Sequence, residues 1–330
     1  MNPIRPSKWT AVARSSDLRK RPLALTIDGV PLVIFRSGDE ISCLTDRCPH
    51  RSAPLSGGAV VNGAIECPYH GWRYNDAGQC VAVPGHLGDL PRSFIPRHAV
   101  READGLIFVS LAKEPGTPYT GALSGPGSVS KMLTNQVHST LAEVAENILD
   151  ATHTHYTHRG VLRGLSARRY KVTVTVTGGD GWVEARYEGE PQQEGLVSRL
   201  FEGERSVSVG RFIAPGIAEL EFWGKLGPNL VTTFHLRQET PDEVRGIGVL
   251  TGPKQGGLGL LKGWLFMPLF RIAVGQDQRI LSAAYRRRKQ FGEIRQMMGP
   301  LDVMRPHIDA ILDGRRPSVA DQPVTMVMEL

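Results

Sequence analysis

The sequence has few cysteines, no long apolar run and no dinucleotide-binding motif. No uncharged apolar stretch approaches the ~20 residues that a transmembrane helix needs. The N-terminal segment MNPIRPSKWT lacks the apolar core of a signal peptide. No G-x-G-x-x-G follows a predicted strand, so we expect no nicotinamide- or flavin-binding module. The sequence predicts a cytoplasmic protein without stable membrane insertion.

The four cysteines favour metal binding over disulfides. A disulfide framework is typical of short secreted chains, whereas 330 residues can bury a large core without covalent links. Cys48 and Cys67 have histidines at ligand spacing. Cys43 and Cys80 do not, and we expect both to be buried free thiols.

The charge balance is mildly basic, with a formal net charge of +6. The densest basic run is Arg286 to Lys289. It is either a solvated helix face or a docking patch for an acidic electron carrier. No recognition motif or aromatic platform accompanies it, so we expect no nucleic-acid binding.

The first third of the chain reads as short strands and turns. Apolar runs such as Leu32–Phe35, bounded by Gly, Asp and Ser, predict strands. The stretch from Pro115 to Ser130 is rich in Gly, Pro and Ser, which is typical of a linker. With 330 residues, two domains are expected.

The remainder predicts helices, then a sheet, then helices. A helix is expected from Ser139 to about His158, and strands from 168 to 252, including Trp182–Tyr187 after a Gly-rich turn. Helices are expected over 258–297 and 301–312. Segregated helices and strands indicate an α+β domain.

A cysteine–histidine pattern in the first domain predicts an iron–sulfur cluster. Cys48-Pro49-His50 is followed, after sixteen residues, by Cys67-Pro68-Tyr69-His70. Two thiolates suit one iron of a [2Fe–2S] cluster and two imidazoles suit the other. A structural zinc site is the alternative, but its usual spacing is Cys-x2–4-Cys followed by His-x3–5-His.

The segments CPHRSAPLSGGAV and ECPYHGWRYN resemble the Rieske domain of bacterial ring-hydroxylating and demethylating oxygenases. Arg51 and the pair Gly71-Trp72 follow the two histidines as in that family. The resemblance implies an α+β fold with an all-β Rieske domain at residues 1–116. A catalytic domain at residues 117–330 would hold an antiparallel sheet covered by helices. The cluster ligands that the resemblance implies are Cys48 and Cys67 on one iron, and His50 and His70 on the other.

A second group of candidate ligands lies between Asp150 and His158. Two histidines and a carboxylate on one side of Fe(II) leave positions open for O2 and substrate. The pattern D-x2-H-x4-H resembles the catalytic signature of the same oxygenases, and residues 147–158 resemble the vanillate and dicamba O-demethylase branch. By this resemblance His153 and His158 are iron ligands, and Asn147 belongs to the catalytic residues. His155 either contacts substrate or has a supporting or surface role.

Asp150 is expected to act between subunits. In the family the equivalent residue bridges an iron-bound histidine and a cluster histidine of a neighbouring chain, which here would be His153 and His70. A carboxylate that accepts from two imidazoles holds both in one tautomer. Asp150 and His153 would share a helix face, whereas His158 would lie off it, so the helix must end or distort nearby.

The third iron ligand is expected on a late helix, where the family places an aspartate. Asp277 is the only acidic residue between Glu243 and Glu293, and the amide Gln276 precedes it. The alternative for Asp277 is an exposed helix carboxylate. The apolar stretch 264–270 either lines a pocket or belongs to the helix core.

The resemblance implies the terminal oxygenase component of a multicomponent monooxygenase. Its cofactors would be a [2Fe–2S] cluster and Fe(II), with electrons from NAD(P)H through a separate flavoprotein reductase, a ferredoxin, or both. Its substrates would be O2 and an apolar or aromatic small molecule, and its assembly a homotrimer. Oxidative demethylation and hydroxylation of a steroid-like or natural-product scaffold are alternative outcomes. An electron-transfer protein with the Rieske site alone is the alternative from another class.

Overall fold

The chain forms two compact units. The computed structural model describes residues 6–161, 168–189, 206–225, 227–254, 258–292 and 296–330. Among the described residues, one unit is Lys8–Tyr119, and the other comprises Pro6, Ser7 and the residues from Thr120 to Leu330. The boundary lies inside the Gly- and Pro-rich stretch 115–130.

The N-terminal unit is built from β-strands, as predicted. Its strands form three small antiparallel sheets with the orders β1-β10-β9, β2-β3-β4 and β5-β6-β7-β8. The strands are β1 (Thr10–Arg14), β2 (Leu23–Ile27), β3 (Val30–Ser37), β4 (Glu40–Thr45), β5 (Ala59–Val61), β6 (Ala64–Glu66), β7 (Arg73–Tyr74), β8 (Cys80–Ala82), β9 (Ala99–Ala103) and β10 (Leu106–Ser110).

Strand β3 separates two hydrophobic cores of this unit. Leu32 and Ile34 belong to one core and Val33 and Phe35 to the other, and all four are fully buried. Successive side chains of a strand point to opposite faces, so an uninterrupted apolar run suits a strand that is covered on both sides. The second core includes Cys48 and the residues around the predicted cluster motif.

The second unit contains one antiparallel sheet of eight strands, in the order β11-β17-β16-β15-β14-β13-β12-β18. The last strand of the chain thus pairs with β12 at one edge. The strands are β11 (Ser128–Val137), β12 (Lys171–Gly179), β13 (Trp182–Glu188), β14 (Val207–Ile213), β15 (Ile217–Gly224), β16 (Gly227–Thr240), β17 (Glu243–Pro253) and β18 (Val324–Glu329).

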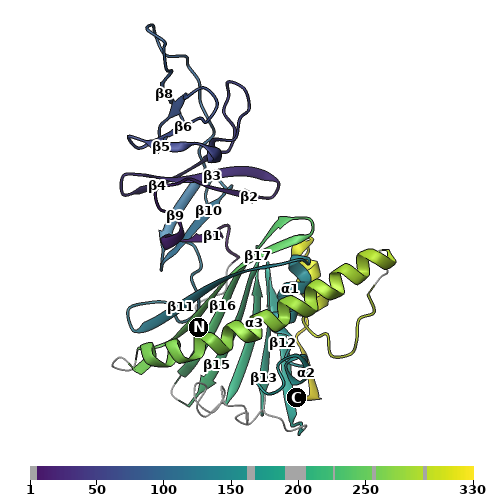
Figure 1. The fold of residues 1–330 in the computed structure, drawn as a ribbon. Helices are drawn as coiled ribbons and strands as arrows, with labels where there is room; N and C mark the ends of the chain where they lie inside the picture. Colours follow the sequence, from purple (N-terminus) through teal and green to yellow (C-terminus); the bar gives the residue numbers. More distant parts are fainter. Residues whose placement is uncertain (1–5, 162–167, 190–205, 226, 255–257, 293–295) are drawn as a thin grey trace. The chain divides into compact units, whose positions relative to one another are not determined.

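Helices cover this sheet, which confirms the predicted α+β class. Figure 1 shows α3 (Leu258–Phe291) crossing the sheet, where it contacts β11 and β17. Helix α1 (Leu141–Leu149) packs against β14, β15 and β16, and α4 (Arg305–Leu312) packs against α1. The hydrophobic core of the unit lies between these helices and the sheet.

The prediction of one helix from Ser139 to about His158 is wrong. Thr140 caps α1, which ends at Leu149, and a separate short helix α2 spans Thr154–Thr157. Asp150 has an extended backbone, with ψ of 115°. Its carboxylate accepts hydrogen bonds from the backbone N–H groups of Thr152 and His153, which competes with helix continuation.

No helix in the described ranges is both long and apolar enough to cross a membrane. The longest, α3, carries charged residues along its length, including Arg271, Asp277 and Arg279.

Candidate metal centres

Three side chains of the second unit converge on one point. The distances are 3.3 Å between Nε2 of His153 and Nε2 of His158, 3.1 Å from the latter to Oδ1 of Asp277, and 3.5 Å from Nε2 of His153 to the same oxygen. Metal–nitrogen and metal–oxygen bonds of ~2.0–2.2 Å place neighbouring ligand atoms about this far apart. In the described part of the chain this is the only group of three ligands with single-ion spacing.

Hydrogen bonds orient both imidazoles toward that point. Nδ1 of His153 donates to the carbonyl oxygen of Asp150 at 2.7 Å, and Nδ1 of His158 donates to Oε1 of Gln276 at 2.9 Å. With Nδ1 protonated, a neutral imidazole has a lone pair on Nε2. The two lone pairs and the Asp277 carboxylate would repel one another unless a cation lay between them.

The electrostatic environment at this point also favours a bound cation. Burial alone lowers the pKa of His153, but the hydrogen bonds and charges of Asp150 and Asp277 outweigh it and raise that pKa to about 9. With both imidazoles neutral and protonated on Nδ1, Oδ1 of Asp277 is buried and accepts no hydrogen bond. A site that holds a proton this strongly, beside an unsatisfied carboxylate oxygen, fits a divalent metal ion.

The three other candidate residues from the sequence differ from these ligands in their contacts. Oδ1 of Asp150 accepts from the backbone and the hydroxyl of Thr152, and its carboxylate is 3.5 Å from Nδ1 of His153. Asn147 lies on α1 outside the cavity described next, and its Oδ1 is buried without a hydrogen-bond partner. His155 lies on α2 and does not line that cavity.

A cavity of about 160 Å³ adjoins His153, His158 and Asp277. Its walls are mostly aliphatic and aromatic. Phe266 and Phe270 of the stretch 264–270 line it, whereas Trp264 is exposed. The further lining residues are Ile148, Leu149, Asp150, Ala151, Thr154, Tyr187, Ser208, Val209, Gly210, Leu220, Phe222, Leu230, Thr232, Phe234, Ala273 and Val274.

Two tight loops carry the cysteine–histidine motif of the N-terminal unit. The N–H of Ser52 donates to the carbonyl oxygen of Cys48, and the N–H of Gly71 donates to that of Cys67. Gly71 has a φ of +73°, and a Cβ there would lie 2.8 Å from Cγ of Pro84. Glycine is therefore required at this position, which explains its place directly after the motif.

The four motif residues divide into buried sulfurs and exposed imidazoles. Cys48 and Cys67 are almost fully buried, whereas His50 and His70 are exposed with ring centroids 4.6 Å apart. No three of the four have ligand atoms within 4.8 Å of one another. A tetrahedral zinc site would need such closeness, whereas a cluster with one iron on the cysteines and another on the histidines would not.

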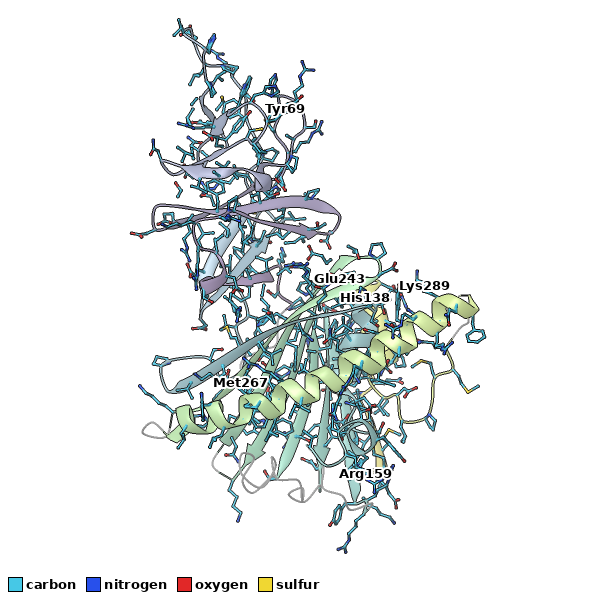
Figure 2. The ribbon with its side chains drawn as sticks, in the orientation of Figure 1. Tyr69, His138, Arg159, Glu243, Met267 and Lys289 are labelled. Carbon is cyan, nitrogen blue, oxygen red and sulfur yellow. The ribbon has the colours of Figure 1, made fainter. Side chains whose placement is uncertain are left out.

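Aromatic side chains surround the exposed histidines. Trp72 stacks on His50, with ring centroids 4.7 Å apart, and Tyr69 lies against His70. Tyr69 is 64% exposed and sits at the surface of the N-terminal unit (Figure 2). The hydroxyl of Tyr74 lies 3.8 Å from Sγ of Cys48 in the buried interior.

Comparison with known proteins agrees with an iron–sulfur domain in the N-terminal unit. The model of the Rieske [2Fe–2S] domain family matches residues 8–91. The oxygenase component of dicamba O-demethylase from Stenotrophomonas maltophilia is 30% identical over 233 residues, which are 68% of this chain and 65% of that protein. The chain therefore contains a Rieske [2Fe–2S] domain and is similar in sequence to an oxygenase component. The predicted resemblance and the [2Fe–2S] domain are thereby confirmed.

Other Rieske relatives match over smaller shares of their length. Methylxanthine N1-demethylase NdmA from Pseudomonas putida is 33% identical over 172 residues, 47% of each chain. The chain thus spans less than two thirds of the relatives that it matches in sequence.

The structural likeness to Rieske oxygenases extends over both units. The crystal structure of dicamba monooxygenase bound to dicamba superposes with a TM-score of 0.76 and 25% identity, covering 92% of this chain and 95% of that one. NdmA with caffeine gives a TM-score of 0.74 at 19% identity, which shows the shared fold.

Some residues of the site were not predicted from sequence. In the sequence Gln276 is only the amide before Asp277, whereas in the structure its hydrogen bond orients His158. Ser208 and Thr232 contribute hydroxyls to the cavity but sit in ordinary strand sequences. Their positions beside the cavity follow from strand pairing, which single-sequence patterns do not reveal.

Proposed function

We propose that this chain is the terminal oxygenase component of a Rieske monooxygenase system. The observation that carries the proposal is the convergence of His153, His158 and Asp277 on one point beside an apolar cavity. A chain that only transferred electrons through a Rieske cluster would have no use for this group. That convergence therefore favours the oxygenase over the electron carrier.

In this proposal each unit holds one redox centre. Cys48, Cys67, His50 and His70 would hold the [2Fe–2S] cluster, and His153, His158 and Asp277 would hold Fe(II). When bound, the cluster supplies electrons one at a time and Fe(II) supplies the activation of O2. The hydrogen bonds from His153 to Asp150 and from His158 to Gln276 keep both Nε2 atoms directed at the iron position.

The cavity would bind and orient the organic substrate. Its apolar walls exclude water next to the iron position, which limits unproductive reduction of O2. Phe266 and Phe270 line the cavity and would pack against an aromatic substrate. Because two relatives are named as demethylases, we infer oxidative loss of a methyl group as the reaction, with hydroxylation of a stable C–H bond as the second candidate. A cavity of this volume favours one aromatic ring over a steroid-like scaffold.

Electrons would come from separate proteins and pass between subunits. A flavoprotein reductase, a ferredoxin, or both would deliver electrons from NAD(P)H. Asp150 would bridge His153 and the partner subunit's His70 in a homotrimer. The lowered pKa of Asp150 supports this role: burial raises it, but the hydrogen bonds with His153 and Thr152 outweigh burial and keep the carboxylate ionised.

The test is the iron content of anaerobically purified protein, together with its EPR spectrum. We expect about three irons per chain and the signal of a reduced Rieske cluster. Asp277→Ala should retain the cluster signal and contain about two irons. Two irons in the unaltered protein would favour the electron carrier, and zinc without colour would contradict both metal assignments.

The reaction type needs a separate assay. Turnover with a methoxy-substituted aromatic compound should release formaldehyde if the enzyme is a demethylase. A hydroxylated product without formaldehyde would instead support hydroxylation of a stable C–H bond. Cys67→Ser removes a predicted cluster ligand and should abolish both products. Any product that forms with this variant measures uncatalysed oxidation.

A further inference from the structure

Two hydroxyl groups of otherwise buried residues line the cavity and have no hydrogen-bond partner among the described residues. Ser208 on β14 and Thr232 on β16 are 6% and 5% exposed, and both line the cavity. No described residue makes a hydrogen bond with either side chain. A ligand that filled the cavity would separate these hydroxyls from water, which is unfavourable unless the ligand offers them hydrogen bonds. The two groups are therefore placed to meet the polar atoms of a ligand.

Charge is nearly absent from the rest of the cavity lining. Among the described residues that line it, the only ionisable groups near neutral pH are Asp150 and the candidate iron ligands. The sheet floor around the two hydroxyls is formed by side chains such as Leu220, Phe222 and Leu230. A charged group of a substrate would find no counter-ion on this floor, and its desolvation would be unfavourable.

We propose that Ser208 and Thr232 form a polar subsite that selects an uncharged, single-ring substrate by hydrogen bonds to its substituents. The inference rests on the proposed oxygenase function and adds the substrate class. The ring lies against the apolar floor, and a hydroxyl, carbonyl or ether group of the substrate meets one of the two side chains. Anionic and cationic rings are excluded because the floor offers them no partner.

The register of the sheet separates the two hydroxyls. Ser208 pairs with Phe222 of β15, whereas Thr232 pairs with Leu220, two residues away on that strand. At ~4.8 Å per strand and ~3.4 Å per residue, their Cα atoms are on the order of 12 Å apart. One small substituent cannot reach both, so the two residues contact opposite sides of the ring.

Gly210 lies on the cavity floor between the two hydroxyls, where the absence of a side chain leaves space for a ligand. It pairs with Leu220, which pairs with Thr232, and all three line the cavity. A Cβ at Gly210 would lie 3.5 Å from Leu149 and 3.6 Å from Leu220, which is ordinary contact. Alanine therefore fits, whereas valine would project into the cavity. A cavity of ~150 Å³ holds one benzene ring in another protein. The cavity here, at about 160 Å³, is only slightly larger, so a side chain that reduced its volume would hinder the binding of a ring.

The experiment is calorimetric binding to the anaerobic holoprotein with three probes: anisole, 4-methoxyphenol and 4-methoxybenzoate. We expect 4-methoxyphenol to bind about ten-fold more tightly than anisole, which is the effect of about one hydrogen bond. We expect 4-methoxybenzoate to bind at least ten-fold more weakly than 4-methoxyphenol. Gly210→Val should weaken the binding of all three, and Gly210→Ala much less.

Variants then assign the preference to the hydroxyls. Ser208→Ala or Thr232→Val, the latter nearly isosteric, should reduce the preference for 4-methoxyphenol over anisole to about two-fold or less. Thr175→Val is the control, because its hydroxyl pairs with Thr325 away from the cavity. If both cavity variants keep the full preference, the polar subsite is wrong. If 4-methoxybenzoate binds most tightly, or if no probe binds at millimolar concentration, the uncharged single-ring class is wrong.

Iron content of the same samples separates this inference from the proposed function. Three irons per chain with tight benzoate binding would reject the substrate class and leave the oxygenase intact. Two irons with the expected probe preferences would reject the oxygenase and leave the cavity as an uncharged-ligand site.

Discussion

Oε1 of Gln276 accepts a hydrogen bond from Nδ1 of His158, and the next residue on α3 is Asp277, whose carboxylate lies 3.1 Å from the other ring nitrogen of the same histidine. One turn of α3 thus both orients His158 and contributes a candidate ligand. Partners that orient ligand histidines typically change metal affinity by about 10–100-fold when removed. We expect Gln276→Ala to lower Fe(II) affinity by that factor, as measured by anaerobic titration against a chelator.

Two further variants control for this effect. Gln276→Glu keeps an acceptor and should retain most of the affinity. Gln278→Ala removes an amide that donates to the carbonyl oxygen of Gln136, away from the metal site, and should leave the affinity unchanged. Equal losses in Gln276→Ala and Gln278→Ala would mean that Gln276 acts only through helix stability.

The hydroxyl of Tyr74 should tune the potential of the cluster. It lies 3.8 Å from Sγ of Cys48, and burial raises the pKa of Tyr74, so the hydroxyl stays protonated and can donate to the sulfur. A hydrogen bond to a cluster sulfur stabilises the reduced state. Tyr74→Phe should therefore lower the reduction potential by tens of millivolts in a redox titration followed by EPR. Tyr69→Phe, on the exposed side of His70, should not.

Arg211 should be essential for the stability of the second unit. Its guanidinium lies 2.7 Å from Glu184, 3.0 Å from Glu219 and 2.6 Å from Glu221. Removing one partner of a buried ionic network typically costs about 3–5 kcal/mol. Arg211→Met should lower the free energy of unfolding by that amount in urea titrations. Arg186→Met, which breaks an exposed pair with Glu188, should cost under about 1 kcal/mol.

His235 should make the second unit sensitive to acid. Burial lowers its pKa to about 4, compared with 6.5 in an unfolded chain. A histidine with a lowered pKa contributes its full stability above pH 6.5, and this contribution falls as the pH drops from 6.5 toward 4. The loss should total about 3 kcal/mol. His235→Leu should remove this component from the pH dependence of urea unfolding.

His138 provides the control for that experiment. It is exposed, near the C-terminal end of α3, where Lys289 pairs with Asp242 (Figure 2). His138→Gln should leave the acid dependence as in the unaltered protein. A pH profile in His235→Leu that matches the unaltered protein would contradict the assignment.

Local motifs were the most predictable part of the molecule. Each half of the cluster motif places its cysteine and its histidine on one tight loop. The spacing of these residues in the sequence therefore indicates that they lie close together in space. Strands such as β3 were predictable because an apolar run that is too short for a helix fits a strand buried on both faces. Asp277 could be selected because α3 contains no other acidic residue.

Other features depend on contacts that spacing does not encode. The break after α1 arises from hydrogen bonds of the Asp150 carboxylate with its own backbone neighbours, and an i, i+3 pattern gives no sign of it. The break also changes which groups face each other: Nδ1 of His153 lies closer to the carbonyl oxygen of Asp150 than to its carboxylate, at 2.7 Å against 3.5 Å. The bridge from Asp150 to another chain remains a prediction.

The candidate iron ligands join two segments that are far apart in the chain. His158 and the residue before Asp277 are 118 positions apart, and strands β12 to β17 lie between them. An ion bound by both segments would close a loop that encloses nearly the whole sheet, and closing so long a loop removes much conformational entropy from the unfolded chain. We therefore expect iron supply to govern the lifetime of the protein as well as its chemistry, with iron-depleted molecules unfolding sooner and being degraded first.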